Sequence, residues 1–174
     1  MKRKLKLRMR LAACFALSVA TLSANAQSDP FGRSFSKPIG AAAPPAVQYI
    51  FPEQINVPAG KPTPVALHFR ISSGLHINSN TPRDEYLIPT TFSIPDGAGV
   101  ELKDAAYPPG SDFTLPIDPK TKLSVYTGEF TIQVHIVATP GNHLVEGKLH
   151  FQACDRNQCM PPKTIPVAID VIAK

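Results

Sequence analysis

Two cysteines, Cys154 and Cys159, are the residues of this sequence best suited to chemistry. They lie in the segment Phe151–Pro162, with four residues between them. If Arg156 and Asn157 form a hairpin turn, Cys154 falls opposite Cys159 on the neighbouring antiparallel strand. Opposed Cα atoms lie roughly 4.5–5.5 Å apart, within reach of a disulfide. The spacing therefore predicts two sulfurs that could form and break a bond easily.

The ring that this bond would close is small, and this limits its value as a structural cross-link. Closing a loop of about six residues removes only about 2 kcal/mol of unfolded-chain entropy, and a longer loop would stabilise more. On the other hand, a cysteine pair in an exported protein is often a permanent disulfide. The residues alone leave both a redox role and a structural role open.

The strand that leads into Cys154 predicts where the two sulfurs point. Apolar residues occupy the odd positions Val145, Leu149, Phe151 and Ala153, and the even positions hold Lys148, His150, Gln152 and Cys154. Because alternate residues of a strand face opposite sides, we expect Cys154 to point away from the core. Cys159, opposite it, should face outward as well. The final strand has the other parity, so we expect a bulge or bend at Pro161-Pro162.

Charged neighbours would tune the reactivity of these cysteines. Asp155 would oppose formation of a thiolate, whereas Arg156 and a protonated His150 would favour it. A metal site is an alternative, since His143 and His150 lie in the same region as the cysteines and thiolates with imidazoles suit zinc or copper. His143 has the opposite strand parity to His150, which counts against that alternative.

The first residues of the chain indicate export. Residues 1–10 contain six of the 18 Lys and Arg, and they precede the apolar residues 11–22 and the sequence Ala24-Asn25-Ala26. This order is typical of a signal peptide cleaved before Gln27, so we expect 1–26, including Cys14, to be removed. The remaining chain then has twelve basic against 13 acidic residues. Its balance does not indicate binding to nucleic acid or membrane, and it has no later membrane-length apolar run.

Alternating patterns predict a β protein downstream of a flexible leader at 27–45. Val65, Leu67, Phe69 and Ile71 alternate with polar residues, and further strands are expected near 47–51, 87–94, 98–106, 125–136 and 164–172. We expect a kink at Gly128. The proline-rich stretch 107–122 reads as a long excursion without regular pairing. Seven or so short strands favour an antiparallel β-sandwich over a small open barrel.

The cysteine segment, Phe151-Gln-Ala-Cys154-Asp-Arg-Asn-Gln-Cys159-Met-Pro-Pro162, resembles the active-site segment of the N-terminal periplasmic domain of the DsbD thiol:disulfide interchange reductases. The resemblance covers most of residues 46–172, with 74–80 and 124–130 as further landmarks. It implies an all-β, immunoglobulin-like antiparallel β-sandwich at 46–174, located in the periplasm. It also implies a thiol-disulfide oxidoreductase in which Cys154 and Cys159 cycle between dithiol and disulfide without a bound cofactor.

The resemblance also implies partners and further site residues. Reducing equivalents would pass from a membrane electron carrier to periplasmic thioredoxin-like proteins. Members of the family shield the cysteines with a cap loop that carries an aromatic residue, which aligns with Phe113, and Asp112 would be a neighbouring acid. The alternative function is a non-catalytic exported β-sandwich binding module in which Cys154 and Cys159 form a structural disulfide.

This sequence departs from the family pattern at three points. Some members have five residues between the cysteines, and tyrosines near the family site are replaced here by His76 and Asn78. A full-length DsbD continues into a membrane domain and a thioredoxin-like domain, whereas this sequence ends at Lys174. We therefore expect the electron donor to be a separate protein.

Overall fold

The structure, a computed structural model, describes residues 44–50 and 54–174. The signal peptide expected at 1–26 lies outside the described residues, as do Phe51 and all of the expected leader except Pro44 and Pro45. Within the described ranges the chain forms twelve strands and no helix. This confirms the all-β class, and none of these residues belongs to a helix with the length and hydropathy of a membrane span.

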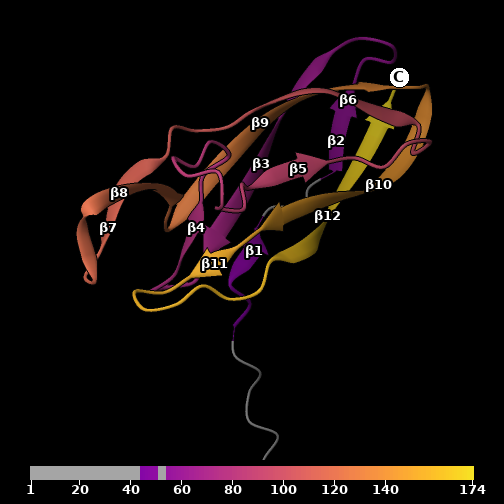
Figure 1. The fold of residues 1–174 in the computed structure, drawn as a ribbon. Helices are drawn as coiled ribbons and strands as arrows, with labels where there is room; N and C mark the ends of the chain where they lie inside the picture. Colours follow the sequence, from indigo (N-terminus) through magenta and orange to yellow (C-terminus); the bar gives the residue numbers. More distant parts are fainter. Residues whose placement is uncertain (1–43, 51–53) are drawn as a thin grey trace, which may run out of the picture. The chain divides into compact units, whose positions relative to one another are not determined.

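Two four-stranded sheets face each other across the core (Figure 1). The first has the order β1-β3-β9-β6 and consists of β1 (Val47–Tyr49), β3 (Thr63–Ile71), β9 (Glu129–Ala138) and β6 (Val100–Ala106). The second has the order β2-β12-β10-β5 and consists of β2 (Gln54–Val57), β12 (Lys163–Ala173), β10 (Gly141–Phe151) and β5 (Thr91–Ser93). The immunoglobulin-like sandwich expected from the sequence is confirmed.

The alternation of apolar residues explains why these strands form a sandwich. In β3, Leu67 and Phe69 are fully buried, while Arg70 beside them is exposed. Side chains from β9, β10 and β12 alternate in the same way and join one apolar cluster with those of β3. Each strand thus buries one face between the layers, and removal of this apolar area from water is the main stabilising term.

A third sheet lies beside the sandwich and holds the cysteines. Its order is β11-β4-β8-β7, formed by β11 (Ala153–Cys154), β4 (His76–Asn78), β8 (Asp118–Tyr126) and β7 (Ser111–Leu115). The chain passes from β8 into β9 of the first sheet through Gly128, which has a φ of +64°. Glycine adopts this conformation readily because it has no Cβ. The kink expected there is in fact a change of sheet.

The prediction of an unpaired excursion at 107–122 is wrong, because β7 and the first part of β8 form a hairpin there. Pro108 and Pro109 precede β7, and Pro116 lies in the turn. The register moves from Thr114↔Lys122 to Leu115↔Asp118, so Pro119 lies in an irregularity of the ladder where its missing N–H is not needed. The prolines are therefore placed where they do not prevent pairing.

One pairing differs from a purely antiparallel sandwich. β2 pairs in parallel with β12, in the register Asp170↔Gln54 to Ala173↔Val57, whereas the other pairs of named strands in the described residues are antiparallel. β10 and β12 form a long antiparallel pair that ends at Phe151↔Lys163. The residues between these two positions project beyond the pair and carry the cysteine segment, with Pro161-Pro162 at the bend where the chain returns.

Candidate disulfide site

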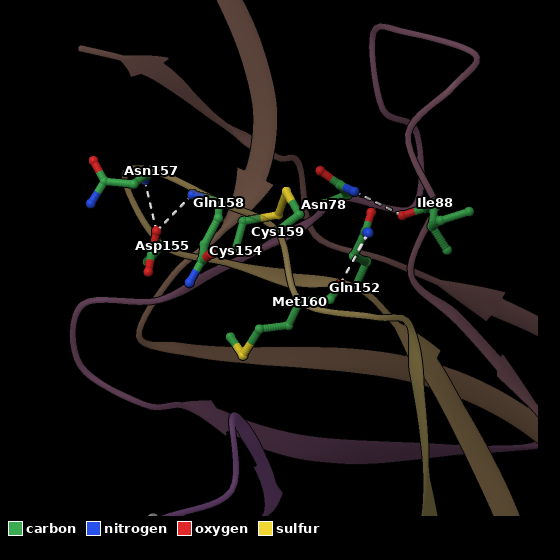
Figure 2. Close-up of a disulfide and its surroundings, with 9 residues drawn as sticks. All are labelled: Asn78, Ile88, Gln152, Cys154, Asp155, Asn157, Gln158, Cys159 and Met160. Atoms are coloured by element: carbon green, nitrogen blue, oxygen red, sulfur yellow. Dashed lines mark hydrogen bonds between the residues drawn. A yellow bond between two sulfur atoms is a disulfide. The ribbon is translucent and has the colours of Figure 1, made fainter. Parts of the chain in front are cut away.

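Cys154 and Cys159 form a disulfide at the tip of this projection (Figure 2). The two residues make an isolated antiparallel bridge, with Cα atoms 4.0 Å apart. The Asp155 N–H donates to the Gln158 carbonyl at 2.9 Å, and the Met160 N–H donates to the Ala153 carbonyl at 2.8 Å. The hairpin with cysteines directly opposite each other, predicted from their spacing, is confirmed.

The side chain of Asp155 fixes the turn. Its Oδ1 accepts hydrogen bonds from the N–H groups of Asn157 at 2.7 Å and Gln158 at 2.8 Å (Figure 2). These donors stabilise the carboxylate and are the main reason that the pKa of Asp155 lies below its ordinary value; a smaller contribution comes from His76. Gln152 Nε2 also donates to the Met160 carbonyl at 3.1 Å, which ties the base of the loop together.

The two cysteines differ sharply in exposure. Cys154 is only 2% exposed, whereas Cys159 is exposed. The prediction that Cys154 faces outward is wrong. The prediction that Cys159 faces outward agrees with its exposure. The reason is that β10 ends at Phe151 and β11 pairs with β4 in another sheet, so the alternation of β10 does not continue. Ala153 and Cys154 are consecutive and both buried.

A small cavity of about 210 Å³ adjoins the disulfide. Its walls combine both cysteines, Asp155, Asn157 and Gln158 of the hairpin tip with two polar residues of β4 and three leucines of other segments: His76, Asn78, Leu87, Leu115 and Leu123. The Asn78 amide donates to the Ile88 carbonyl at 3.0 Å and so holds the loop that carries Leu87 (Figure 2). The disulfide therefore lies against a largely apolar pocket, while Cys159 itself stays exposed.

His76, expected near the site, lies on β4 next to the strand that holds Cys154. It is paired directly with Cys154 across the β4–β11 ladder. It is 2% exposed, and its Nε2 is buried without a hydrogen-bond partner in the described residues. Burial lowers the pKa of His76, and the charge of Asp155 opposes this only in part. The imidazole is therefore neutral at pH 7.

Phe113, the expected cap residue, lies on β7 and packs on His76. The two ring centroids are 4.2 Å apart. Both rings also line a wider, more open groove of about 580 Å³, together with Arg156 and Glu129. Phe113 is thus in contact with the residue that pairs with Cys154, and its role as a cap stays a prediction.

Asp112 lies on the same strand but is engaged elsewhere. Its carboxylate forms ion pairs with Arg83 and with Lys122, the latter at 2.9 Å. Hydrogen bonds from these two cations lower the pKa of Asp112. Asp112 does not line the cavity beside the disulfide, and the acidic residue found there is Asp155.

The histidines of the metal alternative do not line the cavity either. His143 Nε2 contacts the Thr139 carbonyl at 2.7 Å, and His150 Nδ1 contacts Thr164 Oγ1 at 3.0 Å. In the two described ranges no three His, Cys, Asp or Glu residues are grouped so that they could hold a metal ion.

The sequence analysis did not identify three residues that line the cavity beside the disulfide: Leu87, Leu115 and Leu123. The one signal in the sequence was that Leu115 and Leu123 flank a possible turn.

The fold and the site define a β-sandwich that carries a disulfide at a hairpin tip, beside the third sheet that contains the β7–β8 hairpin. The family described as "Thiol:disulfide interchange protein DsbD, N-terminal" matches residues 46–170 of this chain. The chain belongs to this family. It is therefore a thiol:disulfide interchange domain that carries a cysteine pair.

Two solved structures are similar to this chain. The N-terminal domain of DsbD from Neisseria meningitidis, in the reduced form, has 17% sequence identity and a TM-score of 0.44, and the match covers 64% of this chain and 79% of that one. The N-terminal periplasmic domain of ScsB from Proteus mirabilis has 14% identity and a TM-score of 0.49, with 66% of this chain and 43% of that one covered. A comparison with curated protein sequences found no match.

Proposed function

We propose that this domain passes reducing equivalents in the periplasm, through Cys154 and Cys159, from a membrane electron carrier to thioredoxin-like proteins. The observation that carries the proposal is the unequal exposure of the two joined sulfurs. Thiol-disulfide exchange needs one accessible sulfur and a second thiol to resolve the mixed disulfide. An exposed Cys159 joined to a buried Cys154 supplies both.

The exchange that this geometry supports has two steps. In the reduced domain, the Cys159 thiolate attacks the disulfide of a partner, which forms a mixed disulfide and releases one partner sulfur as a thiolate. Cys154 then attacks the Cys159 sulfur, the bond to the partner breaks, and the partner leaves as a dithiol with two electrons gained. A dithiol donor restores the reduced domain by the same steps in reverse.

Local charge supports Cys159 as the sulfur that meets the partner. Arg156 lies in the turn between the cysteines and lines the groove that contains Phe113. A nearby guanidinium favours a thiolate, whereas the Asp155 carboxylate disfavours one. The groove gives a partner room to approach beside the turn that Arg156 occupies between the two cysteines. We propose that the hairpin bearing Phe113 moves aside when a partner docks.

The burial of Cys154 favours the alternative, a structural disulfide in a non-catalytic binding module. The reduction potential separates the two functions. The mature protein is equilibrated with graded glutathione or dithiothreitol buffers, and its free thiols are counted. Reduction within the range of known exchange proteins supports the interchange function, and resistance below about −300 mV supports the structural one.

A trapping experiment tests the partners. A Cys154→Ser variant keeps the exposed sulfur but lacks the resolving one, so it should accumulate mixed disulfides with thioredoxin-like proteins when expressed in the native periplasm. The matched Cys159→Ser variant should accumulate far fewer, since its remaining sulfur is buried. Absence of any mixed disulfide from both variants would contradict the carrier function.

The proposed compartment rests on the N-terminal sequence and on the family. Residues 1–10 are basic and are followed by an apolar segment, which is the order of an export signal. Domains of this family are periplasmic. N-terminal sequencing of the protein recovered from the periplasm should begin at Gln27, and recovery in the cytoplasm with Met1 retained would contradict the assignment.

A further inference from the structure

Resolution of a mixed disulfide requires Cys154 to lose a proton in a buried place. Cys154 is 2% exposed, and burial in apolar surroundings disfavours a thiolate. The thiol, however, is a poor nucleophile, so the attack on Cys159 needs a group that takes the proton. That group has to lie in the cavity that Cys154 lines.

Among the described residues of this cavity, His76 and Asp155 are the titratable side chains other than the cysteines. Asp155 Oδ1 already accepts hydrogen bonds from two backbone N–H groups, which makes its carboxylate a weak base. His76 Nε2 is buried and has no partner, in a side chain that is 2% exposed. An unpaired buried nitrogen is costly, and its retention calls for an explanation.

We propose that His76 accepts the proton of Cys154 when this thiol closes the disulfide, an inference that rests on the interchange function proposed above. The Cys154 S–H proton passes to His76 Nε2 while the sulfur electron pair attacks the Cys159 sulfur. The Cys154–Cys159 bond forms, the bond from Cys159 to the partner breaks, and the partner sulfur leaves as a thiolate. The reverse reaction returns the proton to Cys154.

The position of His76 also gives the proton a way out. His76 lines both the cavity beside the disulfide and the open groove beside Phe113. The imidazolium formed in the step can therefore release its proton on the solvent side. Because His76 pairs with Cys154 across the ladder, the fold itself keeps the two residues adjacent.

Charged and titratable groups around His76 come from every element packed against it. Asp155 and Arg156 face it from the hairpin tip, Arg70 and Glu129 form an ion pair of 2.8 Å in the groove, and Tyr126 lies on the adjacent strand β8. The Asp155 carboxylate stabilises the imidazolium once it has formed. Burial keeps the resting imidazole neutral, as the lowered pKa of His76 indicates, so Nε2 is able to accept a proton at pH 7.

Stopped-flow reaction of the reduced mature protein with Ellman's reagent tests this step. The first thionitrobenzoate release reports attack by the exposed Cys159, and the second reports closure by Cys154. In the wild type, the second rate should fall in acid with a midpoint below pH 6.5, the ordinary histidine value. Above this midpoint the second rate should be nearly constant until the pH reaches the pKa of the Cys154 thiol.

In a His76→Gln variant, and in His76→Asn as a second substitution, the second rate should be about 10²-fold lower at pH 7, near the lower end of the usual contribution of a general base. It should then rise about tenfold per pH unit and meet the wild-type rate once Cys154 ionises unaided. A His150→Gln variant, which makes the same change in a histidine bonded to Thr164, should keep the wild-type profile.

Three outcomes would overturn the inference: an unchanged pH profile in the His76 variants, a slowing by the same factor at every pH, or a wild-type acid midpoint that differs from the His76 titration followed by NMR. The NMR titration uses the wild-type protein and does not depend on the folding of a variant. Failure of the interchange function appears separately, as a disulfide that the glutathione pool cannot reduce.

Discussion

The aromatic ring of Phe113 lies 4.2 Å from the imidazole of His76, measured between ring centroids. This contact joins the β7–β8 hairpin to β4, and through the His76–Cys154 pair it joins the hairpin to the disulfide. A residue far from the cysteines in sequence therefore contacts the residue that pairs with Cys154.

Replacement of Phe113 by alanine tests its role as a cap. In Phe113→Ala, we expect reduction of the disulfide by dithiothreitol to be several-fold faster, because the side chain that covers His76 is gone. Phe113 is half-buried, so the loss of stability should be smaller than the ~3–5 kcal/mol of a fully buried phenylalanine. Tyr86→Ala, at a residue 84% exposed on another loop, is the control. Equal reduction rates in the two variants would show that Phe113 is not a cap.

Reduction of the disulfide should leave the domain folded. The small ring contributes only about 2 kcal/mol through the unfolded chain, and the main apolar cluster, most of which comes from the two large sheets, includes neither cysteine. Urea unfolding with and without reductant should give unfolding free energies that differ by about 2 kcal/mol. The dependence of the unfolding free energy on urea concentration should not change. A Cys154→Ser/Cys159→Ser variant should not respond to the reductant. A reduced wild type without a cooperative transition would mean that the disulfide is structural.

The ion pairs of Asp112 should matter for the hairpin in a pH-dependent way. Since the pKa of Asp112 is lowered by Arg83 and Lys122, their stabilising effect is complete above the ordinary aspartate value of about 3.9 and is lost as the pH falls through the lower folded-state pKa. The difference in unfolding free energy between wild type and Asp112→Asn should be constant from pH 7 to about 4 and should shrink below that. Asp96→Asn, in an exposed turn, is the comparison. A difference that changes between pH 5 and 7 would contradict this account.

Gly110 should be intolerant of a side chain. A Cβ at this position would clash with Ser124 Oγ and would lie 2.9 Å from Ser79 Cβ, in the buried contact where the two serine hydroxyls are 2.9 Å apart. We expect Gly110→Ala to cost about 1–3 kcal/mol of stability, as over-packing usually does, and to displace the hairpin that carries Phe113.

The matched variant for this prediction is Gly110→Ala combined with Ser124→Ala. It removes the hydroxyl that clashes with the new Cβ, so part of the stability lost in Gly110→Ala should return. The recovery should be incomplete, because the close contact between the new Cβ and Ser79 Cβ remains. Thermal unfolding of the three proteins measures the effect. A Gly110→Ala protein as stable as the wild type would show that the hairpin can shift freely.

Local sequence was sufficient for the strands of the sandwich and for the cysteine hairpin. The two-residue period of β3 fixes which face is buried, because neighbouring side chains of a strand point to opposite sides. Likewise, the four residues between Cys154 and Cys159 set their register once the turn forms. Both follow from the backbone geometry of residues close in sequence.

Tertiary structure alone decided the burial of Cys154, the pairing of 111–122 and the isolation of His76 Nε2. Each depends on the third sheet, in which three distant parts of the chain, β4, the β7–β8 hairpin and β11, pair with one another. The two strands that hold His76 and Cys154, β4 and β11, are too short to show a period, and what buries a residue in them is a neighbour far away in sequence. The sequence by itself determined which two cysteines pair and that they can form a disulfide. The third sheet decided that Cys159 is exposed, that Cys154 is buried, and that His76 lies beside Cys154.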